Sequence, residues 1–336
     1  MTDHGWRTLF HPFESAALDA PGAGERVLFL GGQPGFRLPD GFAAALTIVQ
    51  GFRPWFLALG KSGHAVTATP EGDGYDTALV QVGRHRGFNE LQVAEAIARV
   101  RPGGLIVVSG GKEDGIASLR KRVGELLTID GHLSKHHGVA FWLTPPEAFG
   151  DAVAALRESN PPTLVEGRFH TAPGMFSHDR VDAGSRLLAQ HLPAGIAGAV
   201  ADFCAGWGYL SAELLARCPD IETLDLYEAE HAASEAARRN VGDPRAEAFW
   251  HDLIGEPVGR RYDWIVMNPP FHQTRAADPG IGERLIRAAS QALVKGGRLV
   301  MVANQQLPYE ATLKGAFADM REIVRAGGYK VIVARR

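Results

Sequence analysis

The stretch that most constrains this chain is 263–271, where an apolar segment runs directly into two prolines. The segment 264–267 is too short for a helix and suits a buried strand. Two consecutive prolines exclude both a continuing helix and further ladder pairing, so the strand is predicted to end at Asn268. Proline also fixes its own φ and restricts the residue before it. The Asn268 amide and the Pro269 carbonyl are therefore expected to hold one geometry.

This turn presents two hydrogen-bond acceptors beside an aromatic side chain, Phe271. Such a site suits a planar group with an exocyclic NH2, which donates two hydrogen bonds while its ring stacks. The alternative is that the two prolines only end the strand and that Phe271 packs in the core, in which case the same sequence has no binding site. The candidate catalytic residues are Asn268, Pro269, Pro270 and Phe271.

Length and charge limit the possible architectures and partners. A chain of 336 residues predicts roughly two domains of about 150 residues each. The proline pair at 161–162 places the boundary between domains 1–160 and 161–336. A net charge of −3 excludes binding of nucleic acid by bulk positive potential, so any RNA contact requires a local basic surface.

Two further features bear on the cellular compartment. The two cysteines are too few for a disulfide framework and suit a reducing cytosol. We find no signal-peptide pattern and no apolar stretch long enough to span a bilayer. A cytoplasmic protein is expected.

The first half alternates predicted strands and helices, which implies a parallel sheet. The predicted strands are 26–30, 77–82, 105–109 and 138–143, and the predicted helices are 89–99 and a basic helix after Gly111. Segment 163–169 is predicted as one further strand. His132, His136 and His137 have no cysteine or carboxylate at ligand spacing, so a surface turn is expected there and no metal site.

The second half opens with an arrangement typical of nucleotide cofactors. Strand 199–203 contains Asp202 and is followed by the loop 204–208 and a helix from Ser211. Glycines at 206 and 208 permit close approach to the backbone, although the third glycine of the dinucleotide fingerprint is absent. With Asp202 where a pyrophosphate would sit, the loop favours a cationic ligand.

The strands that follow also end in polar residues. Glu228 ends strand 223–227, roughly 20 residues after the loop, where a carboxylate accepts from a ribose diol. Asp252 follows strand 248–250 and is placed to accept from an adenine amino group. Because open α/β sheets bind ligands at the carboxyl ends of their strands, these residues and Asn268 define one site. The alternative is that the polar residues at the four strand ends are unrelated helix caps and turn residues. This would require four independent coincidences. The cofactor-binding candidates are Asp202, Ala205, Gly206, Gly208, Glu228, Asp252 and Asn268.

These residues resemble those of class I S-adenosylmethionine-dependent methyltransferases. More closely, the chain resembles the bacterial small-subunit ribosomal RNA guanine-N2 methyltransferase family. The motifs that carry the resemblance are Phe176-Ser177, Asp182-x-Gly184-Ser185, Gly206-x-Gly208, Asn268-Pro269-Pro270-Phe271-His272 and Leu307-Pro308-Tyr309. Trp207 departs from the pattern, because a small residue is usual between the two glycines, and a contact of its ring with cofactor or substrate is one interpretation. The polar segment 176–185 either closes over a ligand or caps the next helix.

The resemblance implies two tandem Rossmann-like domains, each a seven-stranded mixed sheet flanked by helices, with the N-terminal one degenerate. An internal echo agrees with this. The two halves of the chain show the same succession of a strand, a helix, a pair of glycines and a second strand. In the first half these are 79–82, a helix, Gly103-Gly104 and 105–108, and in the second half 264–267, a helix, Gly296-Gly297 and 299–302. In this alignment Gly83-Arg84-His85 stands where the second copy has Asn268-Pro269-Pro270, so the first copy is expected to be catalytically silent.

The implied reaction is methyl transfer from S-adenosyl-L-methionine to an exocyclic amine, with S-adenosyl-L-homocysteine as product. Guanine N2 of 16S ribosomal RNA is the implied acceptor, with ribosomal RNA or the small ribosomal subunit as partner. Neither a membrane, a metal nor a second copy of the chain is expected. Methylation of DNA adenine or of a protein glutamine stays open, since both present a planar NH2. A ribosome-assembly or RNA-binding factor without turnover is a further alternative.

Overall fold

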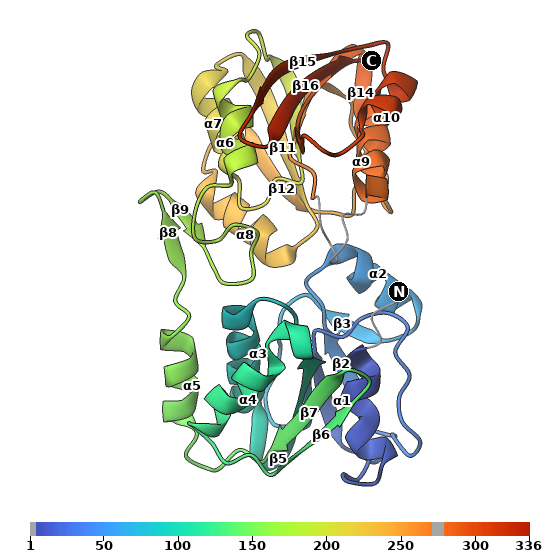
Figure 1. Ribbon diagram of the computed structural model, residues 1–336, viewed down its shortest axis with the longest axis vertical. Coiled ribbons are helices and arrows are strands. Elements are labelled where there is room, and N and C mark those ends of the chain that lie inside the picture. The colour runs from blue at the N-terminus through green and yellow to red at the C-terminus, as the bar shows by residue number, and fades with distance from the viewer. Residues whose placement is uncertain (1–4, 271–278) are drawn as a thin grey trace. The chain divides into compact units, whose positions relative to one another are not determined.

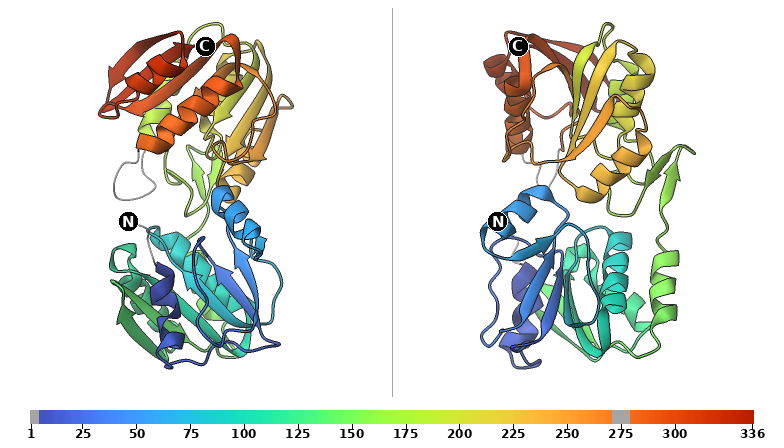
Figure 2. Two further views of the ribbon diagram at one scale, coloured as in Figure 1. Left: turned by 90° about the vertical axis from the view of Figure 1, so that its right-hand side faces the viewer. Right: turned by 180° about the vertical axis from the view of Figure 1, so that it is seen from behind.

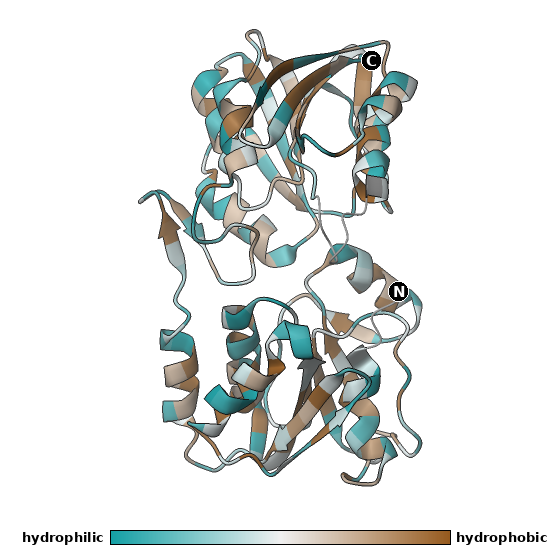
Figure 3. Ribbon diagram, in the orientation of Figure 1, coloured by the Kyte–Doolittle hydropathy of each residue, from teal (hydrophilic) through white to brown (hydrophobic). Residues whose placement is uncertain are grey.

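The structure, a computed structural model, describes residues 5–270 and 279–336. The chain forms two compact units, Met1–Pro161 and Pro162–Arg336 (Figure 1). Each unit contains a seven-stranded mixed sheet flanked by helices, which confirms the predicted fold class. Figure 3 shows that hydrophobic residues concentrate in the strands of both sheets, as expected for strands covered on both faces.

The sheet of the first unit has the strand order β3-β2-β1-β4-β5-β7-β6. Only β7 runs antiparallel to its neighbours. The strands are β1 (Arg26–Leu30), β2 (Ala45–Val49), β3 (Ala65–Thr67), β4 (Tyr75–Gln81), β5 (Val100–Gly111), β6 (Gly131–Lys135) and β7 (Gly138–Leu143). The helices are α1 (Gly5–Glu14), α2 (Arg53–Lys61), α3 (Arg86–Arg99), the short 3-10 helix η1 (Lys112–Asp114), α4 (Ile116–Gly124) and α5 (Gly150–Glu158).

The second unit repeats this order as β12-β11-β10-β13-β14-β16-β15. Its sheet strands are β10 (Gly198–Phe203), β11 (Ile221–Glu228), β12 (Ala246–Trp250), β13 (Tyr262–Met267), β14 (Leu293–Asn304), β15 (Asp319–Ala326) and β16 (Tyr329–Arg335). A separate hairpin joins β8 (Thr163–Val165) to β9 (Phe169–Thr171). The helices are α6 (Ala183–Gln190), α7 (Tyr209–Arg217), α8 (His231–Asn240), α9 (Pro279–Ala292) and α10 (Glu310–Ala316).

Helices cover both faces of each sheet (Figure 2). In the second unit, α6, α7 and α8 pack on one face through residues such as Leu188 and Leu214. Helices α9 and α10 pack on the other face, where Ile286 and Leu313 are fully buried. Each unit therefore has two hydrophobic clusters, one on each side of its sheet.

One strand prediction is wrong. Segment 163–169 was expected as a single strand, yet β8 ends at Val165 and the chain reverses. Glu166 and Gly167 adopt φ values of 53° and 67°, a left-handed pair that closes a tight hairpin. The sequence favoured one strand because Glu166 is not a residue that marks a left-handed turn.

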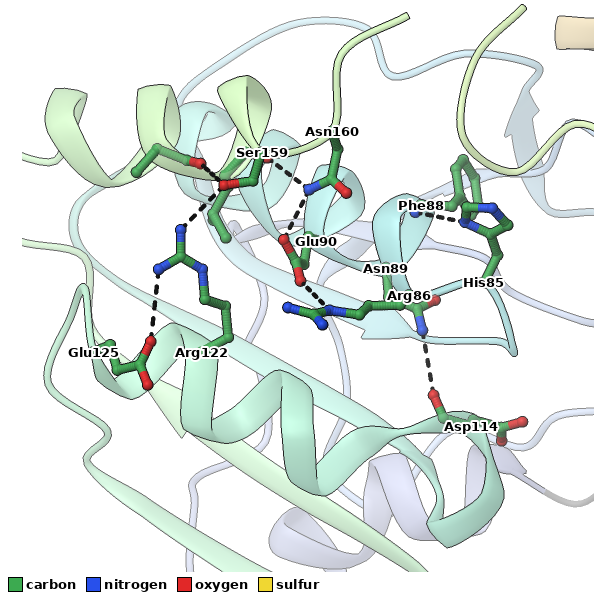
Figure 4. Close-up of polar contacts among 12 residues, drawn as sticks. His85, Arg86, Phe88, Asn89, Glu90, Asp114, Arg122, Glu125, Ser159 and Asn160 are labelled. Atoms are coloured by element: carbon green, nitrogen blue, oxygen red, sulfur yellow. Dashed lines mark hydrogen bonds and ion pairs between the residues drawn. The ribbon is translucent and has the colours of Figure 1, made fainter. Parts of the chain in front are cut away.

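A polar cavity of about 540 Å³ marks the end of α5 in the first unit (Figure 4). The buried Glu90 carboxylate accepts from Arg86 Nε at 2.9 Å and from Asn160 Nδ2 at 2.8 Å. Arg122 Nη1 lies 3.6 Å from the Glu125 carboxylate. Because each arginine has a carboxylate partner, these contacts fix where the chain leaves the first unit and leave little positive charge for a ligand.

Candidate active site

The turn after β13 is held by the start of helix α6. Asn268 Nδ2 donates to Asp182 Oδ2 at 3.1 Å and to Ser185 Oγ at 2.7 Å. Asp182 is the N-cap of α6, and the same oxygen accepts from the Ser185 amide at 2.8 Å. A carboxylate accepts hydrogen bonds and cannot donate them, so these contacts set the orientation of the Asn268 amide. The polar segment before α6 therefore both caps the helix and reaches the predicted catalytic turn.

The orientation leaves Asn268 Oδ1 buried and without a hydrogen-bond partner in the described part of the chain. A buried acceptor left unsatisfied costs about 1–3 kcal/mol, so native proteins rarely keep one without a reason. The chemistry of this oxygen suits an amine donor. Pro269 is buried and Pro270 exposed. Phe271, the fourth predicted catalytic residue, lies outside the described residues, as does His272.

The loop 204–208, which we call the cofactor loop because the sequence predicts that role, is shaped by three residues in the left-handed region. Cys204, Gly206 and Gly208 have φ values of 61°, 56° and 90°. A Cβ at Gly208 would lie 2.8 Å from the Val241 side chain, so glycine is required there for packing against the end of α8. A Cβ at Gly206 would meet nothing within 4 Å, so that side of the loop is open to a ligand. Gly206 also donates its amide to Glu228 Oε2 at 2.8 Å, which joins the loop to β11.

Ala205 completes the loop. It is buried, and its amide donates to the Tyr227 carbonyl at 3.0 Å. Its own carbonyl accepts from the Gly208 amide at 3.0 Å. These bonds hold the backbone of the loop against the carboxyl end of β11.

Glu228 and Asp202 are the acidic residues nearest to this loop. Glu228 is half-buried and accepts from the amides of Gly206 and Glu230, each at 2.8 Å. A carboxylate has about four acceptor positions, so about two remain for a ligand. Asp202 is fully buried and accepts from Ser211 Oγ at 2.7 Å, while its Oδ1 has no partner among the described residues. Burial raises the pKa of Glu228, and it raises the pKa of Asp202 to about 7, with a smaller contribution from the charge of Glu228.

Asp252 lies in a tight turn after β12. Its Oδ1 accepts from the Ile254 amide at 3.0 Å, and its own amide donates to Glu256 Oε2 at 3.0 Å. A Cβ at Gly255 would lie 2.3 Å from Oδ2, so glycine at 255 gives the carboxylate room. The turn fixes the position of Asp252 at the end of its strand.

Trp207 has a structural role in this loop. Its side chain is only 5% exposed and packs on Phe169, with ring centroids 5.2 Å apart. Its Nε1 donates to the Phe176 carbonyl at 2.9 Å. Trp207 therefore ties the segment before α6 to the cofactor loop, and this accounts for the bulky residue between two glycines.

The strand register shows how the first unit differs. Thr77 pairs with Val27 in β1 and with Leu105 in β5, as Trp264 pairs with Val200 and Arg298. Counting along the strands, Gln81 corresponds to Asn268. The predicted match of 79–82 with 264–267 was therefore wrong by two residues, and that of 105–108 with 299–302 by one, because Leu105 corresponds to Arg298. A shift of two keeps every side chain of 79–82 on its own face, so the apolar pattern of that strand does not reveal it.

The same register gives the counterparts of the acidic residues. Phe29 corresponds to Asp202 and Gln50 to Glu228. Gln50 Oε1 accepts from the Phe52 amide at 2.8 Å, as Glu228 accepts from Glu230, but an amide carries no charge. The first unit thus keeps the backbone arrangement of the site and lacks its carboxylates.

Two absences apply to residues 5–270 and 279–336 only. No group of three or more His, Cys, Asp or Glu side chains in this range has the arrangement of a metal site. None of the helices in it has the length and apolar character needed to cross a membrane.

Comparison with known proteins identifies the family. The Methyltransferase small domain family matches residues 166–333. Over 328 residues the chain is 30% identical to ribosomal RNA small subunit methyltransferase C of Pseudomonas aeruginosa strain UCBPP-PA14, which covers 92% of this chain and 94% of the relative. The chain belongs to the ribosomal RNA small subunit methyltransferase C family. This confirms the predicted resemblance, and the protein is a methyltransferase.

Two further similarities agree with this family. A protein of the same name from Chromohalobacter salexigens is 41% identical over 173 residues, which cover 49% of this chain and 51% of the relative. The solved structure of a T. thermophilus 16S rRNA N2 G1207 methyltransferase, in complex with AdoMet and guanosine, is 23% identical with a TM-score of 0.80. It covers 100% of this chain and 92% of that one, so both units of the fold are shared.

Proposed function

We propose that the second unit transfers a methyl group from S-adenosyl-L-methionine to the N2 amine of guanine in 16S ribosomal RNA. The observation that carries this proposal is the Asn268 amide, whose Nδ2 is bound by Asp182 and Ser185 while Oδ1 is buried without a partner. The methyl donor and the guanine acceptor are suggested by the T. thermophilus structure, which contains AdoMet and guanosine.

The loop and the acidic residues fit the proposed cofactor. The remaining acceptor positions of Glu228 suit the two hydroxyl groups of a ribose. Asp252 is proposed to accept from the adenine amino group, and the open side of Gly206 admits the ligand to the backbone. The buried carboxylate of Asp202 favours the positively charged end of the cofactor. S-adenosyl-L-methionine supplies a methyl group that is already activated by its sulfonium.

The protein residues act mainly on the acceptor amine. An aromatic amine is a poor nucleophile because its lone pair is delocalised into the ring. We propose that Asn268 Oδ1 and the Pro269 carbonyl accept its two hydrogens, which favours a pyramidal nitrogen whose lone pair is free to react. A fixed pair of acceptors contributes through positioning and electrostatics.

Access to this site limits the form of the substrate. A base reaches Asn268 only when it is single-stranded or flipped out of its helix. Phe271 is proposed to stack on that base, a role that rests on the sequence alone. The first unit is proposed to support RNA recognition without chemistry, since it lacks the carboxylates of the cofactor site. A cytoplasmic monomer is proposed for the whole chain.

The test is to offer the purified protein and labelled S-adenosyl-L-methionine to naked 16S RNA, assembled small subunits, DNA and protein separately. Label in guanine N2 of either RNA substrate supports the proposal. Label in DNA adenine or in a protein glutamine, with none in RNA, would overturn the assigned substrate. Absence of transfer to all four, by protein that binds the cofactor, would favour a binding factor without turnover.

A further inference from the structure

A groove of about 770 Å³ lies on the second sheet, toward the amino ends of its parallel strands. Six of the side chains that line it are Trp264, Arg298, Asp319, Arg321, Val333 and Arg335. We call it the arginine groove. Asn268 follows Trp264 along the chain at the far end of the same strand, about 13 Å away at 3.3 Å per residue. The groove is therefore separate from the candidate active site but belongs to the same unit.

The groove is built on one row of the sheet. Trp264 in β13 pairs with Arg298 in β14, Arg298 pairs with Arg335 in β16, and Arg335 pairs with Asp319 in β15. Side chains of directly paired residues stand on the same face of a sheet. Arg321, opposite Val333, adds a third guanidinium on this face. In Figure 1, β15 and β16 lie at one margin of the second sheet. The three arginines and Asp319 are exposed to solvent.

The three arginines carry uncompensated charge. Across residues 5–270 and 279–336, none of the three has a carboxylate within ion-pair distance, and Asp319 is the only acid among the lining residues. By contrast, Arg325 on the same strand β15 is paired with Glu322. The Arg298 guanidinium lies over the Trp264 ring, 5.0 Å from its centre, a cation–π contact between two residues that line the groove.

The first unit shows that the fold does not require these cations. In its sheet, Leu105 pairs with Thr77 where Arg298 pairs with Trp264. Gly131 pairs with Trp142 where Arg321 pairs with Val333. At these two positions the paired strands are present in both units and the guanidiniums only in the second, so strand pairing does not require them.

We propose that the arginine groove binds the sugar-phosphate backbone of the RNA substrate, outside the active site. Guanidinium groups match phosphate oxygens in charge and in geometry, and such contacts position a nucleic acid without reading its sequence. A protein of net charge −3 needs a local basic surface to hold RNA, and this groove supplies one. The inference rests on the proposed function, because it takes the substrate to be RNA.

The test compares two full-length variants with the same change in net charge. The groove variant is Arg298→Gln/Arg321→Gln/Arg335→Gln. The control is Arg217→Gln/Arg287→Gln/Arg325→Gln, whose three arginines are exposed but ion-paired with glutamates. Each lost phosphate contact lowers the slope of log K against log salt concentration by roughly 0.7–0.9. In the groove variant we expect this slope to fall by about 2, and the KM for RNA to rise about tenfold, with kcat and cofactor affinity kept.

Equal salt slopes and equal KM values in the groove variant and the control would overturn the inference. If the triple variant is unstable, Arg321→Gln alone serves, because Arg321 is exposed and makes no ion pair within the described residues. A slope unchanged in Arg321→Gln would then count against the groove. Failure of the wild-type protein to methylate RNA would refute the proposed function itself, whereas wild-type methylation with an unaffected groove variant refutes the groove alone.

Discussion

Asn268 Nδ2 lies 3.1 Å from Asp182 Oδ2, although 86 positions separate the two residues in the chain. The N-cap of helix α6 and the turn after β13 therefore share one carboxylate oxygen, which also accepts from the Ser185 amide. Because that oxygen fixes which end of the amide is free, it links helix capping to the orientation of the candidate catalytic group.

Asn268→Ala should lower kcat by on the order of 10²-fold or more, as for loss of one preorganised polar group that binds more tightly in the transition state. Affinity for S-adenosyl-L-methionine should change far less. Single-turnover methylation of RNA, together with calorimetry on the folded variant, measures both quantities. Methyl transfer at the wild-type rate would remove this turn from the catalytic site.

Asp182→Ala and Asp182→Ser separate capping from orientation. Serine is a good N-cap but is too short to replace the contact with Asn268, so Asp182→Ser should recover most of the roughly 1 kcal/mol of stability that Asp182→Ala loses. Both variants should lower kcat by about tenfold, because the Asn268 amide loses one of its two fixed acceptors. Thermal unfolding and turnover are measured side by side. A wild-type kcat in Asp182→Ser would show that Asp182 only caps helix α6 and does not orient Asn268.

Glu228→Gln recreates in the second unit the residue that the first unit carries at Gln50. Loss of charge-assisted hydrogen bonds to the ribose should weaken cofactor binding by roughly 1–3 kcal/mol, or about 5- to 150-fold. Calorimetry on the full chain should also give one cofactor per chain for the wild type. Glu222→Gln, an exposed change on the same strand, is the control. A stoichiometry of two, or equal affinity in Glu228→Gln and wild type, would contradict this assignment.

Asp202 should make stability depend on pH. Its pKa is raised from 3.8 to about 7 in the folded protein, so between these values the folded state holds a proton that the unfolded chain has released. The free energy of unfolding should therefore fall as pH rises from about 4 to 7, by up to roughly 4 kcal/mol, and stay low above that.

Asp202→Asn removes this titration. As pH rises, the wild type should lose stability and the variant should not, so the free energy of unfolding of the variant should rise relative to that of the wild type. Chemical denaturation at pH 5 and pH 8 measures it, with the exposed Asp220→Asn as control. A difference between Asp202→Asn and wild type that is the same at both pH values would show that Asp202 titrates normally.

The features that could be predicted from sequence are those decided by neighbouring residues. Strand β13 ends at Met267, directly before Asn268 and the two prolines that follow it, and Glu228 is the last residue of β11. Here the local rules for proline and for apolar strands were sufficient. The loop between β10 and α7 was located in the same way, from two glycines between a strand and a helix. Its role in cofactor binding stays a prediction.

Contacts between distant segments could not be predicted. Nothing near Asn268 in the sequence indicates Asp182 as its partner, and Trp207 gives no sign that its indole binds the Phe176 carbonyl. Strand β15 was missed because most of its side chains are exposed, so it lacks the apolar alternation that marks a half-buried strand. That Gln81 is the counterpart of Asn268 in the first unit became clear only from the strand pairing of the two sheets.

The separate cores of the two units have a consequence for how this protein unfolds. Among the described residues, each of the four hydrophobic clusters draws its members from one unit only. We therefore expect one core to be lost while the other persists, and two melting transitions in place of one. The second unit contains Trp207, Trp250 and Trp264, and the first contains Trp6, Trp55 and Trp142. Fluorescence from a variant that keeps only the tryptophans of one unit would follow the melting of that unit alone.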